Sequence, residues 1–213
     1  MQPETQAVHL AHHFPSLRTQ EQAARLGMWL FLATEVLLFG ALFTAYSLYR
    51  YLFPHAFEGA SALMHTSWGT ANTLVLITSS LTVALGIHEV SRGRNRRATL
   101  YLLATLAFAV AFLVIKYFEY SHHIHEGQLP GRFYSFAELQ VAGASMFFTL
   151  YFLMTGLHGL HVLIGMGVLA FLTVQVWRGR YGPGYYTPVE LGGLYWHLVD
   201  LIWIFLFPLL YLI

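Results

Sequence analysis

Apolar residues run along the chain in five long stretches with few interruptions. They cover residues 26–52, 67–89, 98–120, 142–177 and 190–213, and each reaches the roughly 20 residues that an α-helix needs to cross a bilayer. The segments between them carry the Gly, Pro and charged residues typical of loops. The pattern predicts an all-α membrane protein: one bundle of five transmembrane helices over residues 26–213, preceded by a polar N-terminal arm at 1–25.

Composition agrees with this pattern. The chain has 213 residues, of which 57% are hydrophobic and only 10% charged, whereas a soluble domain carries about 25% charged residues. A net charge of +1 gives no support to nucleic-acid binding. With no cysteine, disulfides, iron–sulfur clusters and copper centres built on cysteine sulfur are excluded. The N-terminal arm lacks the apolar core of a cleaved signal peptide, so we expect a short cytoplasmic arm.

Positively charged residues predict the orientation of the bundle. With the N-terminus in the cytoplasm, eight of the 11 Lys and Arg residues fall inside: Arg18, Arg25, Arg92, Arg94, Arg96, Arg97, Arg178 and Arg180. The outside segments hold Arg50, Lys116 and Arg132. Because cytoplasmic segments are enriched in Lys and Arg, we expect a cytoplasmic N-terminus, a periplasmic C-terminus, and a third loop, SHHIHEG, on the periplasmic side.

Several ionisable residues lie far inside the predicted spans, where a charge costs at least about 2.5 kcal/mol on insertion scales. Glu35 and Asp200 are predicted near mid-membrane, and His158, His161 and His197 accompany them. Three interpretations compete: a metal or haem site, a proton relay, or buried pairs that fix helix register. The residues alone favour the structural interpretation over the relay, and the relay over the metal site.

Two further features concern packing and the helix ends. Lys116 and Glu119 are three residues apart and are expected to form an interfacial ion pair, and Glu89 is expected to pair with Arg92. Glycines recur on the fourth span, and such small residues allow close helix packing in lipid. The expected close approaches are at Gly156, Gly159 and Gly165.

Five strings together resemble one family, subunit III of the haem–copper oxidases. They are LGMWLFLATEVLLFGALF at 26–43, ANTLVLITSSLTVALG at 71–86, FLVIKYFEY at 112–120, TGLHGLHVLIG at 155–165 and ELGGLYWHLVDLIWIFLFPLLYL at 190–212. They occur in the family's order and account for all five spans. The chain is therefore similar to the five-helix bacterial form of cytochrome c oxidase subunit III.

The resemblance implies a non-catalytic, multi-pass subunit in the bacterial inner membrane. It would pack directly on subunit I beside the other oxidase subunits, hold phospholipid, and contain no haem or copper of its own. It would support proton uptake and turnover stability in a proton-pumping complex of aerobic respiration. Enzyme chemistry is not expected in this chain alone.

The resemblance also assigns roles to individual residues. Glu35, six residues after Trp29, matches an acid near the mouth of a proton-uptake route. Polar positions thought to hold the bundle together are matched by His158, His161, Glu190, His197 and Asp200. We expect His158 and His161 to be metal-free, with at least one of them hydrogen-bonded to a buried carboxyl such as Glu35. Lys116 departs from the family, in which many members have glutamine.

Alternatives exist inside and outside the family. The nearest are subunit III of a quinol oxidase and a homologue attached to nitric oxide reductase, because this chain does not determine the electron donor. A stand-alone transporter and a haem-binding cytochrome b type subunit are the alternatives of a different class. The sequence shows no internal repeat of the kind found in many transporters.

Overall fold

The computed structural model describes residues 10–137 and 139–213, which form a bundle of α-helices. The helices are α1 (Leu17–Leu52), α2 (Pro54–Ala62), α3 (Thr66–Ser91), α4 (Asn95–His125), α5 (Ala144–Trp177) and α6 (Thr187–Tyr211), with a short 3-10 helix, η1 (Gly131–Phe133). Within the described residues, α1, α3, α4, α5 and α6 are long and apolar enough to cross a membrane. This confirms the all-α class and the five predicted spans; which end of the chain is cytoplasmic stays a prediction.

The first helix begins nine residues before the predicted residue 26. Ser16 caps it by accepting a hydrogen bond from the Thr19 amide at 3.2 Å, and residues 17–25 are mostly good helix formers. The predicted arm at 1–25 is thus helical from Leu17, and its residues 1–9 lie outside the described part. At about 54 Å for 36 residues, α1 is much longer than the roughly 30 Å hydrocarbon layer.

Smaller differences occur at the other helix ends. The predicted span 98–120 begins at Asn95 and continues to His125, and 190–213 is shifted to Thr187–Tyr211. The segment between the first two spans was expected to be a loop but contains α2, with Pro54 in its first turn, where proline needs no hydrogen-bond partner. A prediction based only on the length of apolar stretches does not detect short helices or polar helical turns.

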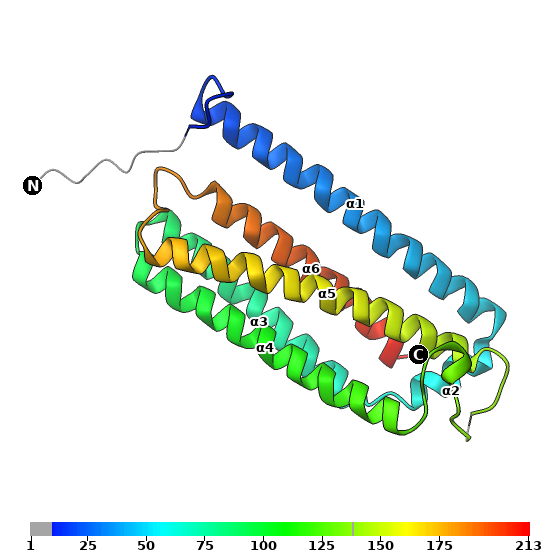
Figure 1. Ribbon diagram of the computed structural model, residues 1–213. Coiled ribbons are helices and arrows are strands. Elements are labelled where there is room, and N and C mark those ends of the chain that lie inside the picture. Colours follow the sequence, from blue (N-terminus) through cyan, green and yellow to red (C-terminus); the bar gives the residue numbers. More distant parts are fainter. Residues whose placement is uncertain (1–9, 138) are drawn as a thin grey trace, which may run out of the picture.

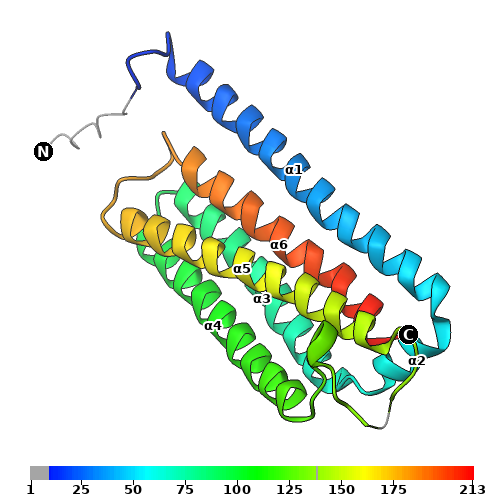
Figure 2. The same cartoon turned by 45° about the vertical axis from the view of Figure 1, so that its right-hand side comes forward.

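Figures 1 and 2 show α3, α4, α5 and α6 grouped together, with α1 running along the outside of the group. The most extensive packing is between α3 and α4. The start of α1 and the end of α6 lie at opposite ends of the bundle (Figure 1), as the odd number of described spans requires. Because α1 lies outside the group of the other helices, many of its apolar side chains are exposed, including Trp29, Leu30 and Leu37.

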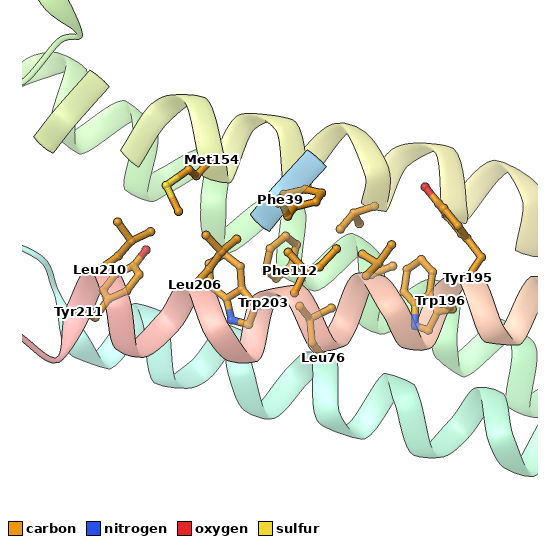
Figure 3. Close-up of a cluster of buried hydrophobic side chains, with 14 of the residues drawn as sticks. Phe39, Leu76, Phe112, Met154, Tyr195, Trp196, Trp203, Leu206, Leu210 and Tyr211 are labelled. Atoms are coloured by element: carbon orange, nitrogen blue, oxygen red, sulfur yellow. The ribbon is translucent and has the colours of Figure 1, made fainter. Parts of the chain in front are cut away.

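The core centres on α6. Its aromatic side chains Trp196, Trp203 and Tyr211 point between α3, α4 and α5 (Figure 3). The rings of Trp203 and Phe112 of α4 meet in a T-shaped arrangement, with ring centroids 4.9 Å apart. Such edge-to-face pairs add to the energy of burial, which gives the apolar helices specific rather than interchangeable neighbours.

The last turn of α6 is held by hydroxyl groups from other helices. Its carbonyls at Leu209 and Leu210 accept from Tyr46 of α1 and, at 3.1 Å, from Ser61 of α2. The carbonyl of Tyr211 accepts from Thr66 of α3 at 3.4 Å. Since the final carbonyls of a helix have no partner within it, these bonds tie α1, α2 and α3 to one end of α6.

Close helix approach occurs at only one of the three predicted glycines. At Gly165, an added Cβ would lie 2.9 Å from the Trp196 ring of α6. At Gly159 nothing lies within 4 Å, and at Gly156 only the Tyr120 hydroxyl does, at 3.7 Å. The prediction is therefore confirmed for Gly165 and wrong for Gly159 and Gly156, because no other helix within residues 10–137 and 139–213 approaches α5 closely at these two positions.

Candidate functional site

The central polar contact joins α1 to α5. Glu35 lies near the midpoint of α1, and its Oε2 is 2.8 Å from Nε2 of His161 on α5. Both side chains are nearly buried, with 13% of Glu35 and 11% of His161 exposed, and the Phe39 ring packs against the imidazole. The prediction that one of the two α5 histidines meets Glu35 is confirmed.

The hydrogen bonds of this pair fix how many protons it holds. His161 Nδ1 lies 2.8 Å from the Leu157 carbonyl, and because a carbonyl only accepts, Nδ1 must carry a proton. The contact between Nε2 and Glu35 then needs a second proton, either on the carboxyl or on an imidazolium. One proton therefore bridges His161 and Glu35, near the midpoint of α1.

His158 is turned away from this pair despite lying only one helical turn from His161. Its ring packs between Phe112 of α4 and Trp203 of α6, with ring centroids 5.5 and 5.3 Å away. Neither ring nitrogen forms a hydrogen bond with any described residue. The two histidines lie three residues apart on α5, but they do not belong to one site.

The polar residues near the middle of α6, His197 and Asp200, face α3 instead of α1. His197 Nδ1 lies 2.7 Å from the Ser80 hydroxyl. Asp200, one turn further along α6, is 3% exposed and has Ser80 beside it. Neither carboxyl oxygen forms a hydrogen bond within the described part of the chain. The six predicted residues are therefore distributed over several separate contacts, and only Glu35 and His161 touch each other.

A second buried cluster surrounds Lys116 and Glu119 of α4. Lys116 Nζ donates to Glu119 Oε2 at 3.1 Å, to the Tyr151 hydroxyl of α5 at 3.1 Å and to the Tyr211 hydroxyl of α6 at 3.0 Å. Both tyrosine hydroxyls in turn donate to Glu119 Oε1. All three ammonium protons have partners, so the ion pair forms a closed and electrically neutral unit.

Aromatic rings complete this cluster. The Lys116 ammonium lies 4.9–5.8 Å from the ring centroids of Tyr120, Tyr151, Trp203 and Tyr211, within cation–π range. The predicted pair forms, and both side chains are buried inside the bundle; its location at the membrane interface stays a prediction. The side chain of Lys116 is 8% exposed and that of Glu119 is not exposed at all, because helices α5 and α6 cover this side of α4.

Glu190 is found in a third contact, at the opposite end of α6. The Arg25 guanidinium of α1 donates to Glu190 Oε2 at 2.9 Å, and the two side chains are 54% and 28% exposed. Near this ion pair an apolar groove of about 610 Å³ runs between α1, α5 and α6. Its lining includes Phe31, Phe171 and Gly192.

Two other expectations concern metal and surface charge. Within residues 10–137 and 139–213, no group of three or more His, Asp or Glu side chains is arranged to hold a metal ion. Glu89 is paired with Arg94, at 3.7 Å, and not with the predicted Arg92. Gly93 has a positive φ of 72° that turns the chain back and brings Arg94 over the end of α3.

Comparison with known proteins decides the family. The sequence profile of cytochrome c oxidase subunit III matches residues 5–213. The chain belongs to this family. Subunit III chains of haem–copper oxidases are membrane proteins of respiration, so this chain is a multi-pass membrane protein and an oxidase subunit III. The match sets aside the stand-alone transporter and the cytochrome b type subunit.

Relatives of this subunit III come from several kinds of oxidase. It is 35% identical over 214 residues to cytochrome c oxidase subunit 3 of Thermostichus vulcanus, covering 97% of this chain and 92% of the relative. Identity to quinol oxidase subunit 3 of Bacillus spizizenii is 29% over 190 residues, covering 88% and 85%. The haem–copper oxidase subunit I+III of Aeropyrum pernix is 31% identical over 199 residues; 89% of this chain is covered, but only 22% of that longer relative.

Sequence reasoning missed the tyrosines that surround the ion pair in this subunit III. Tyr151 and Tyr211 lie on two different helices and meet Glu119 only through tertiary packing. The sequence does show tyrosines within apolar spans, but it does not indicate which residue their hydroxyl groups contact.

Proposed function

We propose that the chain is a non-catalytic subunit III of a proton-pumping haem–copper oxidase in a bacterial inner membrane. It packs directly on subunit I and contributes no haem or copper. The family match supports this assignment, and so does a relative whose name joins subunits I and III in one protein. The chain then serves aerobic electron transport without performing the redox chemistry.

The Glu35–His161 pair carries the proton-uptake part of this proposal. It holds one exchangeable proton near mid-membrane, and Glu35 keeps 13% of its side chain exposed on a helix whose outer face is mostly uncovered. An acid in this position can pass a proton between His161 and groups of a neighbouring subunit. The pair thereby supports fast proton uptake into subunit I and longer turnover before inactivation.

Lipid holding is the second part of the proposal. The groove between α1, α5 and α6 is apolar and large enough, at about 610 Å³, for part of an acyl chain. Arg25 stands near its end and offers a cation to a phosphate headgroup. A bound phospholipid would stabilise the otherwise loosely covered α1 against the rest of the bundle.

The electron donor is proposed to be cytochrome c, with quinol as the alternative. Identity to the cytochrome c oxidase relative is 35%, against 29% for the quinol oxidase relative. Purification from the native membrane, followed by oxygen-consumption assays with each donor, distinguishes the two. The purified complex must contain a subunit I; a chain that purifies alone with a stoichiometric haem spectrum overturns the proposal.

The role of Glu35 is tested in the intact oxidase with Glu35→Gln and Glu35→Ala. Both are expected to assemble, and to show slower proton uptake and fewer turnovers before inactivation than the unaltered enzyme. Glu58→Gln is the matched control, because Glu58 lies on α2 with 65% of its side chain exposed. If the Glu35 variants pump and last as well as this control, Glu35 has only a structural role.

A further inference from the structure

Two histidines from different helices form a hydrogen bond outside the polar clusters described above. His65 is the residue immediately before α3, and His122 lies in the last turn of α4. Their Nε2 atoms are 3.1 Å apart, with ring centroids separated by 5.0 Å. Because a hydrogen bond needs a donor and an acceptor, one Nε2 must carry a proton and the other must not. The contact therefore depends on how many protons the two rings hold.

Neighbouring side chains fix the position of both rings. Trp68 packs against each imidazole, with centroid distances of 5.3 and 6.0 Å. Glu126 Oε1 lies 3.2 Å from Nε2 of His122, and Gln128 donates to the other carboxyl oxygen of Glu126 at 2.9 Å. The carboxylate is thus held beside the ring nitrogen of His122 that takes part in the contact.

Other titratable groups at this end of the bundle have different surroundings. His123 is buried, and its Nδ1 is hydrogen-bonded within the loop that follows α4, while His125 is exposed. From α6 the nearby contact is the Tyr211 carbonyl, which accepts from Thr66 and carries no charge. Within the described part of the chain, Glu126 is therefore the charged side chain that pairs with the two rings.

The helix ends decide which ring is protonated first. His122 lies at the C-terminal end of α4, and His65 lies at the N-terminal end of α3. A positive charge is favourable at a helix C-terminus and unfavourable at an N-terminus, and the Glu126 carboxylate lies beside His122. The His122 imidazolium then donates its Nε2 proton to neutral His65. Such a charge-assisted hydrogen bond is shorter and stronger than a neutral one.

A second proton breaks the contact. Once His65 is also protonated, both of its ring nitrogens carry a proton, so its Nε2 no longer accepts from His122. Two positive rings then face each other beside one carboxylate, that of Glu126, and like charges at this separation repel. The contact is therefore strongest with one added proton, and weaker with none or with two.

We propose that His65, His122 and Glu126 form a proton-binding clamp between α3 and α4. One bound proton tightens the contact between the two helix ends, and a second proton releases it as the surroundings become more acidic. Histidine suits this role because its charge changes between about pH 5 and 8. Since Gln128 ties Glu126 to the loop after α4, the clamp links acidity to the packing of that loop. It does not depend on the proposed oxidase function.

Hydrogen exchange of the intact complex tests the clamp. It is measured from about pH 4 to 9, on both sides of the range in which histidine titrates, and expressed as protection relative to an unstructured peptide. Protection at residues 68–72 and 122–128 is expected to rise as the pH falls, to pass through a maximum and then to decrease. The decrease should approach about tenfold per pH unit, the limit for one linked proton.

Glutamine variants assign each limb of this profile to one ring. His65→Gln keeps an acceptor that takes up no proton, so the loss at low pH should disappear while the rise remains. His122→Gln keeps a donor without a charge, so the rise should disappear while the loss remains. His55→Gln is the control, because His55 is 96% exposed on α2, and it should retain both limbs.

The wild-type profile decides the outcome even where a variant does not assemble. Protection that changes in one direction only over the whole pH range would overturn the proposal. So would a maximum that residues 165–172 of α5 share, because it would belong to the whole bundle and not to this contact. Both limbs persisting in His65→Gln and in His122→Gln would also refute it.

Discussion

Removal of the buried lysine should destabilise this subunit strongly. Lys116→Met takes away the one Lys or Arg that pairs with Glu119 among the described residues, and leaves a carboxylate with no exposed surface. The tyrosine hydroxyls of Tyr151 and Tyr211 can still donate to that carboxylate, but they supply no compensating charge. Breaking a buried ion pair by removing one partner costs about 3–5 kcal/mol, because the other charge stays in a medium that solvates it poorly.

A double variant that also changes Glu119 provides the comparison. In Lys116→Met combined with Glu119→Gln, no buried charge remains in this cluster, and the amide oxygen still accepts from both tyrosines. Replacing a whole buried pair is far less costly than breaking it, so the double variant should be more stable than Lys116→Met alone. The energies are then non-additive, as expected for residues in direct contact.

The assay is thermal challenge of the detergent-solubilised oxidase, followed by measurement of the folded subunit III that remains in the complex. At roughly 2–4 °C per kcal/mol for a chain of this size, Lys116→Met should lower the midpoint by about 6–20 °C. The double variant should recover part of this loss. If Lys116→Met melts within about 2 °C of wild type, the closed hydrogen-bond unit does not contribute to stability as argued.

Three smaller effects follow from packing and exposure. Gly165→Val should cost about 1–3 kcal/mol by overpacking in the same thermal assay, since even a Cβ would lie 2.9 Å from Trp196. Gly159→Ala, where nothing lies within 4 Å, should be neutral or stabilising by up to about 1 kcal/mol; a loss there would show that a partner subunit packs on this position. Arg25→Ala should change stability by less than about 1 kcal/mol, and less still in high salt, because its ion pair with Glu190 is largely exposed.

The number of spans was predictable from sequence because bilayer thickness alone sets a minimum apolar length. The start of α1 was not, since residues 17–25 are polar and the cap at Ser16 is a local hydrogen bond with no hydrophobic signal. The close helix packing at Gly165 could not be singled out from the sequence either. Three glycines carried the same small-residue signal, and only tertiary structure decides which of them faces Trp196.

The candidate site was predictable in part. A carboxyl at mid-span needs a partner, and His161 lies at a similar depth on another span, so their contact followed from depth and chemistry. The tyrosines around Glu119 could not be found in this way, because α5 and α6 bring them from distant parts of the chain. Arg94 was missed in favour of Arg92 because the positive φ of Gly93 reverses the local geometry.

The buried acids differ in whether a proton can leave them. Glu119 is closed off by three hydrogen-bond donors and has no exposed side chain, so any exchange would break a neutral unit. Asp200 is 3% exposed and faces the interior between α3 and α6. Of these three acids, only Glu35 has both a histidine partner, His161, and an exposed part of its side chain. It also lies on α1, the span that the other described helices cover least. A proton-handling role for this subunit should therefore be sought first at the outer face of α1, where a neighbouring subunit would meet Glu35.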